Sequence, residues 1–229
     1  MKPTTALCLI VATLLLTGMT GAPALPLSET FDKHRGTDLT WYVTGPPFDP
    51  GDTDAAPPVG ASASWGDECL RFDMGRDMAA AIWFAEASTV SASFDLYVSS
   101  DFDLLNAGAY VHLGDLPLFV WIGNSDGRVA MLFDVDPYDA VPVPISTDAF
   151  HHVEIMADGR TGQWRGLVDG ELAASGMAEG FVGRKFGGMS YAGWTWDGET
   201  GPPQVYFDNF AVEKLSAWPG SMYLPLSFG

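Results

Sequence analysis

Cysteine is scarce in this sequence, which contains only Cys8 and Cys69 in 229 residues. Cys8 lies in an N-terminal segment that we expect to be removed, and the one remaining thiol cannot close an intramolecular disulfide. Cys69 stands in a Cys-Leu-Arg-Phe stretch, which favours a small buried side chain over a reactive one. Stability must therefore come from a hydrophobic core, and about 200 residues are ample for one.

Basic residues are also few, because 11 lysines and arginines stand against 29 aspartates and glutamates, with a formal net charge of -18. A surface this acidic repels nucleic acid and anionic membranes, so we exclude both as partners. It also argues against strongly anionic polysaccharides as ligands unless a local basic pocket overrides it. Divalent cations, cationic partners and a salty habitat all suit the composition, which does not separate them.

The sequence has only one long apolar run, and that run lies at the N-terminus. Lys2 precedes apolar residues from Leu7 to Leu16, and the segment closes on the small-x-small sequence Ala22-Pro23-Ala24. This pattern predicts a secretory signal peptide over residues 1–24, cleaved after Ala24. The run is shorter than the roughly 20 residues that cross a bilayer. We therefore expect an exported protein without a membrane span.

Helical periodicity is weak after the export segment, and alternation with a period of two takes its place. From Val90 to Ser99, Phe94, Leu96 and Val98 fall on one side of a strand, whereas Asp95 and Tyr97 fall on the other. Similar short runs recur between Gly, Pro, Asp and Asn. Besides Val90–Ser99, we expect strands at Ala80–Phe84, Ala107–Leu113, Leu118–Ile122, Val129–Val135, His152–Ala157, Trp164–Val168, Gly187–Trp194 and Val205–Glu213.

Turn signals join these strands and complete the predicted architecture. Asp169-Gly170 between apolar runs favours a two-residue primed turn with positive φ, inside a three-strand meander that begins at His152. Proline-rich stretches from Gly45 to Gly60 and from Pro137 to Pro144 predict surface loops. The number and spacing of the strands predict an all-β, two-sheet antiparallel β-sandwich over residues 25–215, followed by a C-terminal tail at 216–229.

A family resemblance rests on the meander. Phe150-His151-His152-Val153-Glu154-Ile155 is followed by Asp158-Gly159 and then by Val168-Asp169-Gly170-Glu171-Leu172. This resembles the concanavalin A-like lectin/glucanase superfamily, including laminin-G-like modules, and implies a jelly roll. Glu29-Thr30-Phe31-Asp32 and Val205–Val212 fit the first and last strands, which often pair in that superfamily. The meander needs an apolar inner face and a tight turn, so we interpret His151, His152 and Glu154 as framework residues.

The resemblance also implies a structural calcium ion where the first and last strands pair. Asp208 occupies the position of the metal-binding aspartate, with Glu29 and Asp32 as possible helpers. Carboxylate and carbonyl oxygens are the ligands that calcium takes. The alternative is that Asp208 only hydrogen-bonds at the strand edge.

Aromatic residues suggest a sugar-binding platform, because sugar rings stack on flat side chains while polar neighbours fix their orientation. Trp194 and Trp196 fall on one side of a predicted strand, and Trp121, Tyr110 and Tyr97 join them if they share a sheet face. The alternative for each ring is burial in the core, the commoner fate in a sandwich.

Catalytic signals are weaker. The Glu-x-Asp-x-x-Glu strand of glucanases with this fold is missing, as are cysteine metal clusters, phosphate-binding glycine loops and Gly-x-Ser-x-Gly elbows. Tyr110 and His112 fall on one face, which suits proton abstraction in a lyase, with Asp95 or Asp115 as an acid. The Gln and the Arg-rich strand of such lyases are absent.

Three functions follow in order of preference. The first is a secreted, lectin-like module that binds a glycan or glycoconjugate. The second is a glycan-degrading hydrolase or lyase of the same fold. The third is a structural or adhesive surface protein, favoured if the tail aromatics Trp218, Tyr223 and Phe228 are exposed.

Overall fold

The computed structural model of the chain describes residues 22–29, 42–44, 70–72, 78–100, 107–113, 119–125, 128–134, 141–195 and 205–219. These residues form strands joined by turns, and the exception is a single turn of 3-10 helix, η3 (Glu179–Phe181). The strands are β1 (Leu27–Glu29), β2 (Tyr42–Thr44), β3 (Leu70–Phe72), β4 (Met78–Ala87), β5 (Thr89–Val98), β6 (Ala107–Leu113), β7 (Phe119–Ser125), β8 (Arg128–Asp134), β9 (Val141–Pro144), β10 (Phe150–Asp158), β11 (Gln163–Val168), β12 (Glu171–Met177), β13 (Phe186–Thr195) and β14 (Val205–Lys214).

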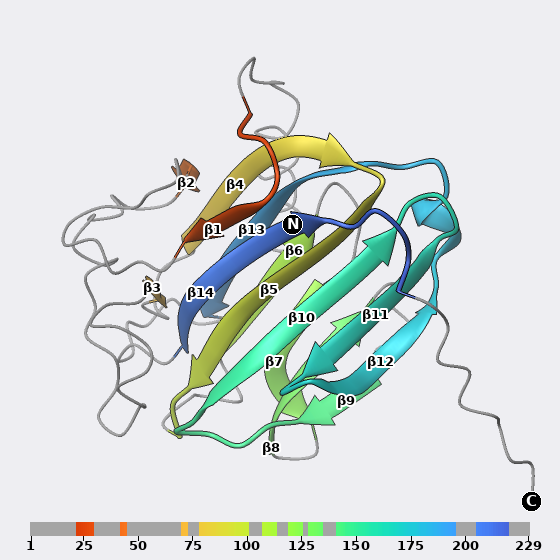
Figure 1. Ribbon diagram of the computed structural model, residues 1–229. Coiled ribbons are helices and arrows are strands. Elements are labelled where there is room, and N and C mark those ends of the chain that lie inside the picture. Colours follow the sequence, from red (N-terminus) through yellow and green to blue (C-terminus); the bar gives the residue numbers. More distant parts are fainter. Residues whose placement is uncertain are drawn as a thin grey trace, which may run out of the picture.

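The strands form two antiparallel sheets that lie one behind the other (Figure 1). Sheet A, in front, has the order β1-β14-β5-β10-β11-β12, and β3 also pairs with β14. Sheet B, behind, has the order β2-β4-β13-β6-β7-β8-β9. The predicted all-β sandwich is therefore confirmed. Among the described residues, no helix has the length and apolarity to cross a bilayer.

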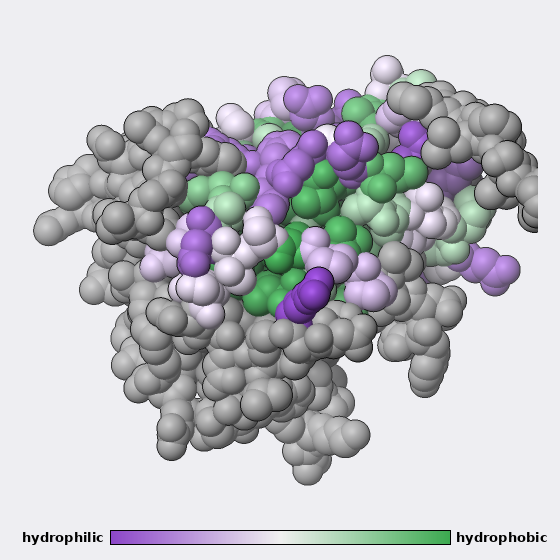
Figure 2. Space-filling model, turned by 90° about the horizontal axis from the view of Figure 1, so that it is seen from below, coloured by the Kyte–Doolittle hydropathy of each residue, from purple (hydrophilic) through white to green (hydrophobic). Residues whose placement is uncertain are grey.

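The core lies between the sheets and is built from alternate residues of each strand. Phe94 and Leu96 of β5 are fully buried, as is Val153, which pairs with Phe94 across the β5–β10 ladder. Sheet B contributes buried residues such as Phe133 to the same cluster. Burial of one such side chain stabilises the fold by about 1.5–3 kcal/mol. Seen from below, hydrophobic residues gather toward the middle of the described part, with hydrophilic residues around them (Figure 2).

The predicted meander is confirmed in its strands and in its turn. Strands β10, β11 and β12 pair in sequence order, and the β11–β12 turn has φ of 53° at Asp169 and 81° at Gly170. Positive φ at both central residues is the geometry that Asp-Gly favours in a two-residue hairpin. The turn residue Asp169 is thereby held beside the start of β10.

The first and last strands pair, as the resemblance implies. Strand β1 lies against β14, with Leu27 opposite Val212 and Glu29 opposite Phe210. On its other side β14 pairs with β5, and the register shifts between Asp208 and Ala211. Asn209 lies in this bulge with φ of 46°, a conformation that asparagine tolerates better than most residues.

One predicted loop is partly wrong. Within the stretch from Pro137 to Pro144, the last residues form strand β9, which pairs with β8. β9 is an edge strand, so Pro142 and Pro144, which have no N–H, need not donate to a second neighbour. The loop predicted from Gly45 to Gly60 lies outside the described residues, as do residues 1–21 of the predicted signal peptide.

Candidate functional site

Sheet A presents an outer face that carries chemically active side chains. On the three adjacent strands β10, β5 and β14, the residues that alternate with the core line up across the ladders. One transverse row is aromatic and consists of Phe150, Tyr97 and Tyr206. The next row is ionisable and consists of His152, Asp95 and Asp208. We call these the aromatic row and the polar row.

The aromatic row is packed edge to face. The ring centroid of Tyr97 lies 5.3 Å from that of Phe150 and 5.7 Å from that of Tyr206, with interplanar angles of 56° and 86°. The Tyr97 hydroxyl donates to Asp148 Oδ1 at 3.2 Å. Burial, with help from the Asp148 carboxylate, raises the pKa of Tyr97 to about 12. Phe150 and Tyr206 are half-buried, so they are the parts of this row that solvent can reach.

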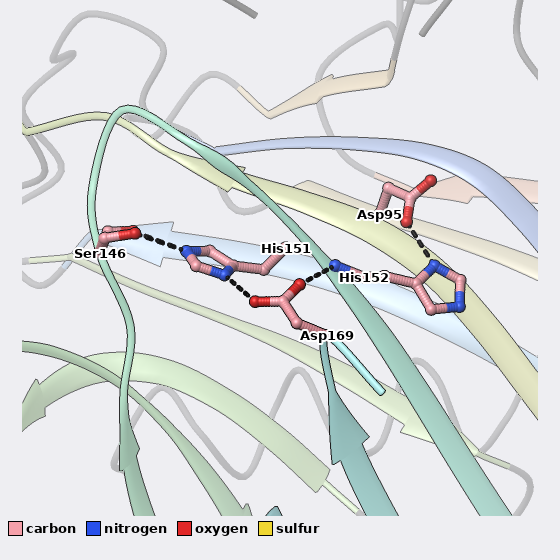
Figure 3. A network of polar contacts seen from close by, with 5 residues as sticks. All are labelled: Asp95, Ser146, His151, His152 and Asp169. Carbon is pink, nitrogen blue, oxygen red and sulfur yellow. Dashed lines mark hydrogen bonds and ion pairs between the residues drawn. The ribbon is translucent and has the colours of Figure 1, made fainter. Parts of the chain in front are cut away.

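The polar row centres on a histidine–carboxylate pair (Figure 3). Nδ1 of His152 lies 2.6 Å from Oδ1 of Asp95, and the histidine side chain is 50% exposed whereas that of the aspartate is 7% exposed. Burial raises the pKa of Asp95, although hydrogen bonds from His152 and Asn209 act in the opposite direction. Because a carboxylate only accepts, the imidazole donates through Nδ1 and its Nε2 is directed away from Asp95.

A second histidine fixes the backbone of the first. Asp169 accepts the backbone N–H of His152 at Oδ1 (2.9 Å) and the Nδ1–H of His151 at Oδ2 (2.8 Å). Nε2 of His151 lies 3.0 Å from Oγ of Ser146, so both ring nitrogens of His151 are engaged (Figure 3). This arrangement joins the segment before β10 to the β11–β12 turn. It makes His151 a structural residue and leaves His152 as the accessible imidazole.

Carboxylates surround the pair. Asp208 is fully buried, and its Oδ1 accepts the backbone N–H of Asn209 at 2.7 Å. In the row beyond, Glu154 is half-buried and accepts a hydrogen bond from the hydroxyl of Ser91 at 2.5 Å. Of these two carboxylates, Glu154 is the one that solvent can reach.

The C-terminal segment borders this face. The backbone N–H of Leu215 donates to the carbonyl of Thr89 at 3.0 Å, and the chain after β14 then runs across sheet A (Figure 1). The Trp218 ring covers Arg165 of β11, with 5.2 Å between the guanidinium carbon and the ring centroid. The described part of the tail thus packs back on the domain, whereas Tyr223 and Phe228 lie outside the described residues.

The structure describes two of the three predicted calcium ligands. Asp208 and Glu29 lie on the paired strands β14 and β1, and Asp32 lies outside the described residues. Calcium takes roughly six to eight oxygen ligands. In the part of the chain that the structure describes, no group of three or more His, Cys, Asp or Glu residues is placed to hold a metal ion. These residues alone do not complete a calcium site.

The predicted aromatic platform is divided between the sheets. Trp121 lies on β7 and Trp194 on β13, both in sheet B, whereas Tyr97 lies on β5 in sheet A. Tyr97 therefore does not join the tryptophans, because the two sheets face each other through the core. Trp196 lies outside the described residues, so the tryptophan part of the platform stays a prediction.

The predicted catalytic candidates belong to sheet B. Tyr110 and His112 lie on β6, where the backbone register sets Tyr110 opposite Trp121 and His112 opposite Phe119. They are thus on a different sheet from Asp95 and His152. Local sequence patterns did not predict that Asp95 and His152 form a hydrogen-bonded pair. Its members are 57 positions apart, and only the β5–β10 register brings them together. The available signal was that each falls on the polar side of its predicted strand.

No family model matches the sequence, and no curated protein matches it. Solved structures match in three dimensions. A sialidase matches with a TM-score of 0.50 and 12% identity, over 65% of this chain and 15% of the sialidase chain. The botulinum neurotoxin serotype D ligand binding domain in complex with N-acetylneuraminic acid matches with a TM-score of 0.53 and 16% identity, over 83% of this chain and 48% of that chain. Another structure of the serotype D binding domain matches with a TM-score of 0.55 and 15% identity, over 83% and 48% of the two chains.

These likenesses define the class of the protein by its fold. The chain spans about half the length of the neurotoxin domains and a small part of the sialidase. At such identities a shared β-sandwich is what the comparison shows, because one fold serves many functions.

Proposed function

We propose that the protein is an exported, lectin-like module of the concanavalin A-like type that binds a glycan or glycoconjugate on the outer face of sheet A. The observation that carries the proposal is the aromatic row lying directly beside the polar row on three adjacent strands. Tyr206 and Phe150 offer apolar ring surface, while His152 offers a polar atom to a sugar hydroxyl. Apolar contact together with a few fixed polar groups is the usual composition of a small-ligand site.

The fold comparisons support this proposal indirectly. One neurotoxin domain that shares the sandwich is described in complex with N-acetylneuraminic acid, and another matching structure is a sialidase. Both descriptions concern sugars. They make a glycan a reasonable first ligand class to test, although a shared fold alone does not assign a function.

Two parts of the proposal concern residues at the ends of the domain. Export is supported by the signal-peptide pattern over residues 1–24.

A structural calcium ion near Asp208 is supported by the buried carboxylate on the strand that pairs with β1. A calcium ion bound only by the folded state raises the melting temperature, so calcium should raise it and a chelator should reverse the effect. An unchanged melting temperature would contradict the calcium part alone.

The direct test is a glycan-array screen with wild-type protein and Tyr206→Ala. Removing this half-buried ring should weaken binding at least tenfold, because the apolar contact at one end of the aromatic row is lost. Lys185→Ala is the control, since Lys185 is exposed beside Glu86 of β4 at 3.7 Å, away from this face. Absence of any glycan binding, or equal binding by Tyr206→Ala and wild type with intact circular dichroism, would contradict the proposal.

The Asp95–His152 pair favours one further candidate function, a glycan-degrading enzyme. A buried carboxylate that orients a half-exposed imidazole is an arrangement that general bases use. Two assays on the same glycans separate the two functions. A reducing-sugar assay detects hydrolysis, and the absorbance of unsaturated products detects lyase activity. Turnover that disappears in His152→Ala would support the enzyme, and binding without turnover supports the lectin-like module.

A further inference from the structure

We infer that the outer face of sheet A takes neutral or amine-bearing sugars in preference to anionic ones, because its exposed carboxylates set the charge preference while His152 accepts a hydrogen bond from the ligand. This inference rests on the proposed function and names the ligand class for that same face. The juxtaposition behind it is an outward imidazole acceptor, a row of carboxylates and an adjoining aromatic row.

The acceptor character of His152 follows from its partner. Asp95 lies 2.6 Å from Nδ1 and is the accepting group, so the Nδ1–H is used inside the protein. In the neutral imidazole the other nitrogen then carries a lone pair. Nε2 points away from Asp95, and the side chain is half exposed (Figure 3). A ligand that meets this atom satisfies it by donating a hydroxyl or ammonium hydrogen.

The backbone holds this acceptor in place. Asp169 Oδ1 accepts the His152 backbone N–H at 2.9 Å, and the same carboxylate is fixed by His151. With the backbone fixed in this way, the bond from Nδ1 to Asp95 sets the orientation of the ring and keeps the Nδ1–H turned away from a ligand. A site that presents a fixed hydrogen-bond acceptor disfavours ligands that have no donor at that position. The acceptor would then stay unpaired after the ligand has displaced water.

Charge on the same face acts in the same direction. Carboxylates that solvent reaches stand on the face and at its edge, namely Asp148, Glu154, Asp169 and Glu213, while Asp95 and Asp208 lie buried beneath them. Among the described side chains, two guanidinium groups near the face are engaged, Arg165 beneath Trp218 and Arg160 with Asp158 at 2.9 Å. The backbone register also sets Arg71 of β3 opposite Tyr206. An anionic sugar would thus approach exposed carboxylates of like charge, whereas an ammonium group would be attracted.

The inference opposes the ligand that fold likeness alone suggests. N-acetylneuraminic acid, the sugar in the neurotoxin complex, carries a carboxylate. If the fold dictated the ligand, this chain would bind anionic sugars. If the side chains on sheet A dictate it, anionic sugars are the disfavoured class.

Three oligosaccharides of equal length distinguish these possibilities in calorimetric titrations at pH 7.5: oligomers of glucose, glucosamine and glucuronic acid. We expect the glucose and glucosamine oligomers to bind at least tenfold more tightly than the glucuronate oligomer. His152→Ala should weaken binding of the glucose oligomer about tenfold, because one oriented acceptor is lost.

A charge-reversal pair provides the matched control. Glu154→Lys places a cation in the row beside His152, whereas Glu86→Lys makes the same charge change at an exposed position of β4 in sheet B. Glu154→Lys should raise affinity for the glucuronate oligomer about tenfold and lower that for the glucosamine oligomer. Glu86→Lys should leave both affinities unchanged within twofold.

The outcomes separate the two claims. If no oligosaccharide of any charge binds in the titrations or on the array, the proposed function fails and takes the inference with it. If glucuronate binds as well as glucose, or if Glu154→Lys and Glu86→Lys behave alike, the inference is wrong while glycan binding stands. Circular dichroism checks folding, and if His152→Ala does not fold, the charge-reversal pair still decides.

Discussion

The two faces of strand β5 differ although their residues alternate along one short segment. Phe94 and Leu96 point into the core and are fully buried against apolar neighbours. Asp95 and Tyr97, between and beyond them, are almost as buried on the other face, but each is held by a polar partner. On the inner face, the size of a side chain decides whether it fits. On the outer face, its hydrogen-bond partners decide.

This difference separates stability from function in the sandwich. A change of size on the inner face should cost stability and leave the chemistry of the folded molecule alone. A change at a side chain of the outer face that solvent reaches, such as Tyr206, should alter binding with little loss of stability. Substitutions that violate this division are the most informative ones.

The largest expected effect is on the inner face. Phe94→Ala removes a fully buried ring that packs 5.8 Å from the ring of Phe207. The free energy of unfolding should fall by about 4 kcal/mol, from lost burial and the cavity left behind. Urea denaturation followed by tryptophan fluorescence measures it. A loss below about 1 kcal/mol would mean that β5 does not face the core as described.

Asp158 tests whether the end of the outer face behaves differently from its middle. This buried carboxylate accepts hydrogen bonds from Thr89 Oγ1 at 2.9 Å, Arg160 Nε at 2.9 Å and Thr161 Oγ1 at 3.1 Å. Asp158→Ala should lower the free energy of unfolding by about 3 kcal/mol, because several donors lose their acceptor. An unchanged unfolding midpoint would contradict this framework role.

The pH dependence of the same variant has a defined sign. Burial alone would raise the pKa of Asp158, but the hydrogen bonds from Arg160, Thr89 and Thr161 outweigh it and hold the pKa below the ordinary value of 3.8. The stabilisation is therefore complete above that value and is lost as the pH falls through the lowered pKa. The stability difference between wild type and Asp158→Ala should shrink below about pH 4. A difference that grows on acidification would reverse the assignment.

A glycine pair tests the contact between the sheets. A Cβ on Gly166 of β11 would lie 2.1 Å from the Phe133 ring of sheet B, so Gly166→Ala forces the sheets or the ring to shift. Overpacking of this kind costs about 2 kcal/mol. Gly180→Ala is the control because a Cβ there meets nothing within 4 Å. Equal melting temperatures for the two variants would contradict the packing of sheet A on sheet B.

The smallest effect is expected where the tail meets sheet A. Trp218→Ala removes the ring above Arg165, a half-buried contact worth about 0.5–1 kcal/mol. Thermal unfolding should show a small decrease, and Arg165→Ala should add little more because both changes remove the same contact. Fully additive losses would indicate that the two side chains act separately.

Local sequence patterns predicted most of the longer strands and the Asp169-Gly170 turn because each depends on neighbouring residues. Alternation placed Phe94 and Leu96 on one side of β5, and positive φ at Asp169 and Gly170 follows from the turn chemistry. The prolines of β9 were misleading, since edge pairing tolerates them. The longer strands were thus largely predictable, whereas the three-residue strands β2 and β3 are too short to show a clear alternation and were missed.

The candidate site was not predictable to the same extent, because it depends on pairing between distant segments. Sequence alone does not reveal that β5 lies between β10 and β14, so the Asp95–His152 pair and the aromatic row around Tyr97 stayed hidden. For the same reason Tyr97 was grouped with Trp121 and Trp194, which belong to the opposite sheet. The meander predicted framework roles for both His151 and His152, but the structure separates them, because the His151 side chain is 12% exposed and that of His152 is 50% exposed.

Chemical-shift mapping by NMR tests the central claim most directly. A neutral glucose oligomer is titrated into isotope-labelled protein, and the perturbed backbone amides are assigned. The account predicts that the largest shifts cluster on Tyr97, His152 and Tyr206 and their neighbours in β5, β10 and β14. Shifts centred instead on Trp121 and Trp194 of sheet B, or no shifts at all, would contradict a ligand site on the outer face of sheet A.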